Sequence, residues 1–279
     1  MKNILYATDY TEHSVSALRY AYDLSSRIKA RLIVLHVFDV MTFTGTTVIS
    51  SLRQTSKRLY EEQYSILKEY CIRHLGNNLS DMNIQIEVAR NISITEEILL
   101  KVKELSVDMV VIGIKDKYSK RGFLEGDIAK KLITKISCPL MVIPNNSIAT
   151  EIKNIVYATD FEEEDIFAIK RLLEIAAFFE ATIHVVHISS KEKDEDENQM
   201  AWFKEMLFQK VSYPNLEFDV LVSDNIHDKL NEYLKSLDAD IIAMLERGRR
   251  GFIKKLFHKD VVKQIESHTT IPLLSFNIN

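Results

Sequence analysis

The nine residues KNILYATDY at positions 2–10 recur at positions 153–161 as KNIVYATDF, and only Leu5/Val156 and Tyr10/Phe161 differ. A chain of 279 residues has room for one large α/β domain or for two of ordinary size, and length alone does not decide between them. An internal repeat of this length favours two copies of one fold, separated by 151 residues.

Strand-like and helix-like patterns alternate within the first copy. Residues 3–8 are a short apolar run rich in β-formers, and residues 12–28 repeat apolar side chains about every three positions, as a helix that buries one face requires. Residues 31–38 are apolar on both faces, which is typical of a parallel strand covered by helices on each side. The rest of the copy predicts, in order, a helix over about 51–74, a strand over 83–89, a helix that opens with a capping box of Ser93 and Glu96, a strand ending at 113, a helix from about 127 and a strand near 139–144.

The second copy repeats these elements in the same order but is shorter. Residues 30–39 match 181–190 at the offset of 151, whereas 107–113 match 239–245 and 138–144 match 271–277 at offsets of 132 or 133. Nearly twenty residues are therefore missing between the second and fourth strands. The charged run SKEKDEDENQ stands there, and we interpret it as a solvated loop or a first helical turn. A boundary near residues 145–150 predicts domains at 1–146 and 151–279.

Composition excludes several classes of function. A net charge of −4 gives no basic excess to attract a phosphate backbone, so nucleic acid is an unlikely partner. No apolar run reaches the roughly 18 residues of a spanning helix, and the first residues lead into a strand rather than a signal peptide, so we expect a cytoplasmic chain without a membrane segment. Cys71 and Cys138 lack metal-ligand spacing and are expected to be buried thiols.

Four motifs in this order resemble the tandem universal stress proteins: ATD closing the first strand of both copies, LHV and VHI closing the second, DMVVIG, and CPLMVIP. The resemblance covers nearly all of both halves. It implies an α/β fold of two tandem adenine-nucleotide-alpha-hydrolase-like (Rossmann-like) domains, each a five-stranded, mainly parallel sheet with helices on both faces. It also implies that the two halves pack as an internal pseudo-dimer through antiparallel last strands, and it leaves room for a homodimer.

The same resemblance implies where a nucleotide would bind. In nucleotide-binding members, the aspartate after strand one and the end of strand two hold adenine, positions taken here by Asp9 and Val37. A glycine-rich loop after strand four, Gly-x2-Gly-x9-Gly-Ser/Thr, holds the ribose and phosphates, and Gly113 and Gly126 take its first and third glycines. Glycines let the backbone approach phosphates, and the free N–H groups of a helix start attract anions.

Two carboxylates depart from this loop pattern in the first half. Asp116 replaces the second glycine, and Asp127 stands where Ser or Thr is expected. An aspartate there is expected to cap the following helix, a gain of about 1 kcal/mol, and to repel a triphosphate. Nearby Lys and Arg residues would offset part of that repulsion.

The second half departs further from the pattern. Leu245 replaces the first glycine, Lys259 replaces the third, and Asp260 follows, although Gly248 keeps the second. We therefore expect an adenine nucleotide, such as ATP, in the first half only if at all, and we expect Asp160 to organise the turn after its strand. The basic run 247–255 is interpreted as a solvated loop over the mouth of a site, with regulatory-anion binding as its alternative.

No catalytic or metal-binding motif is present in the sequence. His184 and His187 are three apart in a strand, so they point to opposite faces and cannot share one ion, and the equivalent His36 and His187 are expected to have structural roles. An ATP-pyrophosphatase or a flavodoxin-like carrier would need a phosphate loop after the first strand, where the acidic segment DYTEH stands. Two hypotheses remain: a non-catalytic stress-response or signalling module with a degraded nucleotide site, and an ATP-binding protein with slow hydrolysis or autophosphorylation.

Overall fold

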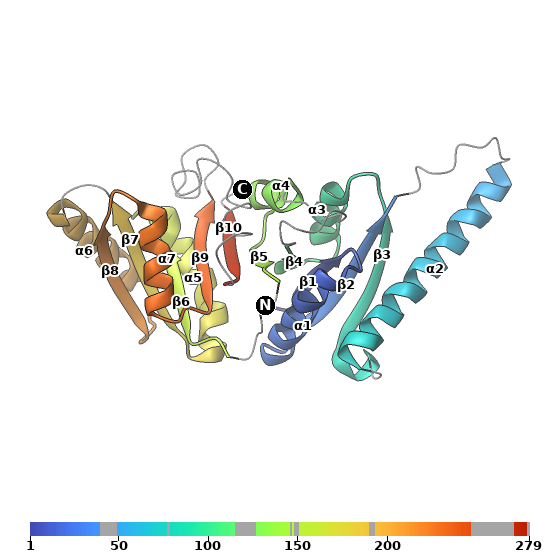
Figure 1. Ribbon diagram of the computed structural model, residues 1–279, viewed down its shortest axis with the longest axis horizontal. Coiled ribbons are helices and arrows are strands. Elements are labelled where there is room, and N and C mark those ends of the chain that lie inside the picture. The colour runs from blue at the N-terminus through green and yellow to red at the C-terminus, as the bar shows by residue number, and fades with distance from the viewer. Residues whose placement is uncertain are drawn as a thin grey trace.

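A single ten-stranded sheet runs through the protein in the order β3-β2-β1-β4-β5-β10-β9-β6-β7-β8. The computed structural model describes residues 1–39, 49–76, 79–114, 127–145, 147, 151–189, 193–246 and 271–277. Figure 1 shows the sheet along the long axis of the molecule, with β5 and β10 near its middle and the two repeated halves on either side.

The first half contributes five parallel strands, because each strand is followed by a helix that returns the chain across the sheet. The apolar runs at 3–8 and 31–38 form strands with the predicted bounds. In chain order the elements are β1 (Asn3–Thr8), α1 (Glu12–Arg27), β2 (Arg31–Phe38), α2 (Ile49–Leu75), the 3-10 helix η1 (Leu79–Met82), β3 (Ile84–Arg90), α3 (Ile94–Glu104), β4 (Met109–Gly113), α4 (Asp127–Lys135) and β5 (Leu140–Ile143).

The second half repeats this arrangement, again with parallel strands. Its elements are β6 (Asn154–Ala158), α5 (Glu163–Phe179), β7 (Thr182–Ser189), α6 (Lys193–Lys210), β8 (Leu216–Val222), α7 (Ile226–Ser236), β9 (Ile241–Glu246) and β10 (Leu273–Asn277). The helix α6 is shorter than α2, its counterpart, as the smaller residue offset indicates.

The two halves meet where β5 and β10 pair antiparallel. Leu273 lies opposite Val142, and Ser275 lies opposite Leu140. This is the strand pairing expected from the sequence, and it satisfies the backbone groups of two strands that would otherwise be sheet edges. The tandem copies therefore share one sheet.

Helices cover both faces of that sheet, because side chains alternate along each strand. In β1, Ile4 and Tyr6 pack with one set of helices, and Leu5 and Ala7 pack with the other. The first set is α1, α2, α5 and α6, and the second is α3, α4 and α7. Within the part of the chain that the structure describes, no helix has both the length and the apolar character needed to cross a membrane.

Two local expectations need correction. Ser93 caps α3 by accepting the N–H of Glu96 over 3.3 Å, but the carboxylate of Glu96 accepts from Nζ of Lys135 over 2.9 Å instead of completing a capping box. The run SKEKDEDENQ does enter a helix, α6, but Asp196 within it is buried rather than solvated. It is buried because it lies on the same helical face as Met200, Phe203 and Leu207.

Candidate functional site

Each half has a point where the winding direction of the sheet reverses. In the first half it lies between β1 and β4, and in the second between β6 and β9, because the connections lead outward in opposite directions from these strands. In open α/β sheets, ligands bind at the carboxyl ends of the strands beside such a point. The predicted nucleotide positions follow β1, β2 and β4, so they lie at the carboxyl ends of the strands beside this point.

Asp9 follows β1 at this edge and organises the turn into α1. Its Oδ1 accepts the backbone N–H of Thr11 over 3.1 Å and the hydroxyl of Thr11 over 2.7 Å. Tyr10 between them has a φ of 64°, a left-handed conformation that is uncommon outside glycine, and its N–H donates to Oγ1 of Thr8 over 3.1 Å. The turn-organising role expected for Asp160 is thus observed for its counterpart, Asp9.

The side chain of Tyr10 closes over His36 at the end of β2. Their ring centroids are 4.0 Å apart with the planes inclined by 28°, and Nδ1 of His36 lies 2.9 Å from the carbonyl oxygen of Thr8. A carbonyl only accepts, so Nδ1 carries the proton and donates it. Burial lowers the pKa of His36, although the bond to Thr8 and the charge of Asp9 raise it in part. The imidazole is therefore a neutral structural group at neutral pH.

Val37 and Gly113 lie beside Asp9 on the neighbouring strands. Thr8 pairs with His36 across β1 and β2, so Asp9 follows at the level of Val37, whose side chain is buried in the core. Gly113 ends β4 on the other side of β1 and pairs with Ile143. The backbone thus brings three of the five predicted site residues to one edge of the sheet. Gly126 lies outside the described residues, and of Asp127 the structure describes only its place as the first residue of α4.

The second half builds the same turn with the same contacts. Phe161 has a φ of 63°, and its N–H donates to Oγ1 of Thr159 over 2.9 Å. Its ring lies 4.3 Å from that of His187, whose Nδ1 is 2.7 Å from the carbonyl oxygen of Thr159. The structural roles expected for His36 and His187 are confirmed by these paired contacts.

The end of β7 differs from the end of β2, because a carboxylate from α6 covers it. Oδ2 of Asp196 accepts the hydroxyl of Ser189, and Oδ1 lies 3.9 Å from Nε2 of His187. Asp196 is 5% exposed. A buried carboxylate of α6 therefore lies at the carboxyl end of β7.

A second acidic residue lies at the end of β9. Leu245 takes the place of Gly113, as the sequence predicts, and Glu246 after it is 5% exposed. A buried carboxylate at this point raises the free energy of binding a phosphate, because like charges in a poorly solvated place repel strongly. Two buried carboxylates, Asp196 and Glu246, therefore lie near the carboxyl ends of β7 and β9.

Among the described residues, no site for a metal ion is found. Across the described ranges, no group of three or more His, Cys, Asp or Glu side chains is placed to hold a metal ion. The phosphate-loop residues 115–126, the basic run 247–255, and Gly248, Lys259 and Asp260 all lie outside the described residues. The expectations attached to them stay predictions.

Sequence reasoning missed Asp196 and Glu246. The spacing of Asp196 from Met200, Phe203 and Leu207, at four, seven and eleven residues, is a helical signal that would have placed its side chain on the buried face. Glu246 continues an apolar strand, and the sequence alone does not distinguish a buried end from an exposed one.

Comparisons with known proteins agree with this architecture. The sequence model described as the Universal stress protein family matches residues 1–144 and again residues 151–276. A universal stress protein of Methanocaldococcus jannaschii is 25% identical over 142 residues, which cover 51% of this chain and 81% of the relative. A crystal structure of a universal stress protein from Archaeoglobus fulgidus DSM 4304 covers 99% of this chain and 98% of its own at 14% identity, with a TM-score of 0.70.

A structure of a universal stress protein in complex with cAMP matches about half of the chain, 47%, and 100% of its own length, at 15% identity and a TM-score of 0.38. The two matches of the family model cover nearly the whole chain, and they coincide with the two halves of the sheet. The chain therefore belongs to the universal stress protein family, as a tandem member with two copies of the domain.

Proposed function

We propose that this chain is a non-catalytic stress-response or signalling module of the cytoplasm, built from two universal stress domains of which the second has lost its nucleotide site. The domains are proposed to extend over 1–146 and 151–279. The free, buried thiols of Cys71 and Cys138 agree with a reducing compartment.

The observation that carries this proposal is the contact of Asp196 with Ser189 and His187 at the carboxyl end of β7. It supports loss of the site because the second half stabilises its own carboxylate where a ligand would have to displace it. Removing that carboxylate from its hydrogen bond would cost about 1–3 kcal/mol before a ligand gained anything.

A second candidate function is ATP binding by the first half. The convergence of Asp9, Val37 and Gly113 favours it, since these residues keep the adenine and first-glycine positions. Asp116 and Asp127 argue against it, because they bring two negative charges to the phosphate end. We propose Asp9, Val37, Gly113, Gly126 and Asp127 as the contacts of any nucleotide that this half holds.

Titration with a fluorescent ATP analogue separates the two candidates. The non-catalytic module is expected to show no saturable binding in the low-micromolar range, and purified protein is expected to carry no nucleotide in native mass spectrometry. Low-micromolar binding that Gly126→Trp abolishes, and that Asp224→Trp at an exposed position of the second half preserves, would establish the ATP-binding function instead.

We further propose that the two halves act as an internal pseudo-dimer. The pairing of β5 with β10 supports this, because it joins the copies edge to edge. A homodimer of whole chains would then need a different surface, such as the helices that cover the sheet. The same native mass spectra would report it.

A further inference from the structure

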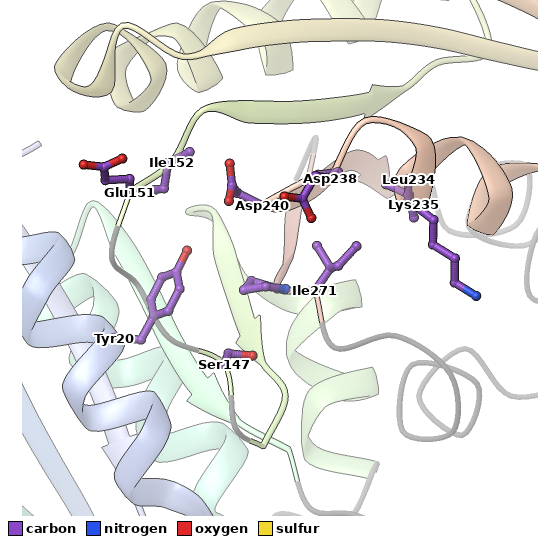
Figure 2. A pocket seen from close by; sticks show the side chains of 11 residues that line it. Tyr20, Ser147, Glu151, Ile152, Leu234, Lys235, Asp238, Asp240 and Ile271 are labelled. Atoms are coloured by element: carbon purple, nitrogen blue, oxygen red, sulfur yellow. The ribbon is translucent and has the colours of Figure 1, made fainter.

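A cavity of about 310 Å³ lies between the two halves, away from both carboxyl edges considered above. Its wall combines α1 of the first half with the chain around the start of β6, the loop between α7 and β9, and the residues before β10. Figure 2 shows these side chains around one space, and the polar residues among them include Tyr20, Glu151, Lys235, Asp238 and Asp240. The volume is at the lower end of small-molecule sites.

Tyr20 directs an unsatisfied hydroxyl toward this space. The residue is 3% exposed, and its hydroxyl has no hydrogen-bond partner in the described part of the chain. Figure 2 shows the ring extending from α1 with its oxygen pointing toward the side of the cavity where Ile152 and Asp240 lie. A buried hydroxyl without a partner costs about 1–3 kcal/mol, so such groups call for an explanation.

Carboxylates outnumber cations around the cavity. The described lining holds Glu151, Asp238 and Asp240 but one cation, Lys235, which is exposed and whose side chain extends away from Tyr20 in Figure 2. The carboxylate of Glu151 is already paired with Lys153, with Oε2 and Nζ 2.8 Å apart. Within the described residues, Asp238 and Asp240 form no salt bridge, although Asp240 lies close enough to Lys153 to raise its pKa after the stronger effect of Glu151.

Asp240 has acceptor capacity to spare. Its Oδ2 accepts the N–H groups of Lys153 over 2.6 Å and of Asn154 over 2.9 Å, at the start of β6. Within the described residues no hydrogen bond reaches its Oδ1, and a carboxylate accepts about four in total. The charge of Asp240, after burial, also raises the pKa of Tyr20, which places the two groups close together and keeps the hydroxyl protonated.

The internal repeat provides its own comparison for this site. Asp108 repeats the role of Asp240, since its Oδ2 accepts the N–H groups of Lys2 and Asn3 over 2.5 and 2.9 Å. At the offset of 151 residues, the counterpart of Tyr20 is Arg171 on α5. Burial raises the pKa of the Cys138 thiol to about 12, and Arg171 lowers it while Asp108 raises it, so both charges lie near the same residue of the first half.

The two sides of the junction therefore differ in one charge. On the Asp108 side, α5 of the opposite half carries Arg171, which lies near Cys138, whereas on the Asp240 side α1 carries the neutral ring of Tyr20 and a cavity is present. We propose that this cavity is a binding site for a small organic cation bearing an ammonium or guanidinium group, which takes beside Asp240 the place that Arg171 takes near Asp108. Asp238 and Asp240 would accept its N–H groups, and the hydroxyl oxygen of Tyr20 would accept a further N–H of the same ligand.

Calorimetric titration of the full chain with agmatine, which carries both cationic groups, tests the proposal. Glutarate serves as an anion of similar length. We expect agmatine to bind saturably and to raise the melting temperature of the protein. Glutarate is expected not to bind. Tyr20→Arg should weaken agmatine binding about tenfold or more, because its own guanidinium would occupy the site. Ser26→Arg, which adds the same charge at an exposed position of α1, should leave binding unchanged.

Tyr20→Phe provides a second variant that preserves the shape of the ring, and it should weaken agmatine binding a few-fold. The proposal is overturned if agmatine does not bind saturably, if Tyr20→Arg and Ser26→Arg bind it equally well, or if glutarate binds in its place. If the ATP-analogue titration contradicted the proposed function, these outcomes would not be affected. The cavity and the nucleotide site share none of the residues named for them.

Discussion

The hydroxyl of Tyr157 donates to Oδ1 of Asp165 over 2.8 Å, whereas the equivalent Tyr6 donates to the backbone carbonyl of Ser14 over 2.5 Å. Both tyrosines are fully buried behind the turn that follows the first strand of their half. Oδ2 of Asp165 also accepts hydrogen bonds from the hydroxyl of Thr159 over 2.9 Å and from the N–H of Glu162 over 3.2 Å. One carboxylate thus ties together the strand, the turn and the start of α5.

Replacing that carboxylate by an amide should destabilise the protein. Asp165→Asn keeps the volume but presents an N–H₂ group to donors, and we expect the free energy of unfolding to fall by about 2 kcal/mol. Urea denaturation followed by circular dichroism measures it. Glu164→Gln, at the exposed neighbouring position, is the control and should change little. Equal stability of both variants would contradict the role given to Asp165.

The carboxylate of Asp108 should protect the start of β1. Asp108→Ala removes the acceptor of the Lys2 and Asn3 amides, and a loss of about 1 kcal/mol corresponds to local exchange roughly fivefold faster. Hydrogen exchange followed by NMR reports each amide. The amides of Lys153 and Asn154, which Asp240 holds in the same way, are an internal control that should not change.

Stability should fall on mild acidification, in part through His36. Because burial holds the pKa of His36 below its ordinary value, the unfolded chain takes up a proton first as the pH falls below about 6.5. The contribution of His36 to the free energy of unfolding is therefore fully present above that pH and is lost as the pH falls below it. His36→Gln should flatten the decline in unfolding free energy between neutral and mildly acidic pH, and His227→Gln on α7 is the control. An unchanged slope in His36→Gln would refute the assignment.

Both cysteines should resist thiol reagents in the native state. Burial raises the pKa of Cys71 and of Cys138 to about 12, so the thiolate fraction falls on the order of a thousandfold relative to a free thiol. Reaction with a chromogenic disulfide reagent should wait for unfolding. Leu100→Cys, at an exposed position of α3, should react at once and calibrate the assay. Rapid release of the chromophore by the unsubstituted protein would show that one of its two thiols is accessible.

The order of helices and strands was predictable because hydrophobic periodicity identifies each element from its own residues, and the internal repeat gives the same order twice. Residues 3–8 and 31–38 form strands with the predicted bounds, and the meeting of Asp9, Val37 and Gly113 follows from the order of parallel strands. These features need no side-chain detail.

The features that escaped prediction depend on contacts between distant elements. Asp196 belongs to an acidic run, and although its spacing from Met200 indicates a buried helical face, its contacts with the end of β7 become visible only in the folded structure. Tyr20 has an ordinary place on an amphipathic helix, and its unpaired hydroxyl becomes visible only when the opposite half is in position. Sequence periodicity carries no information on such pairs.

The two halves that pair through β5 and β10 belong to one chain, and this has a genetic consequence. In an assembly of two identical chains, every substitution appears on both sides of the symmetry axis, so a change that benefits one side burdens the other. Here a codon change such as the one separating Tyr20 from Arg171 alters one side alone.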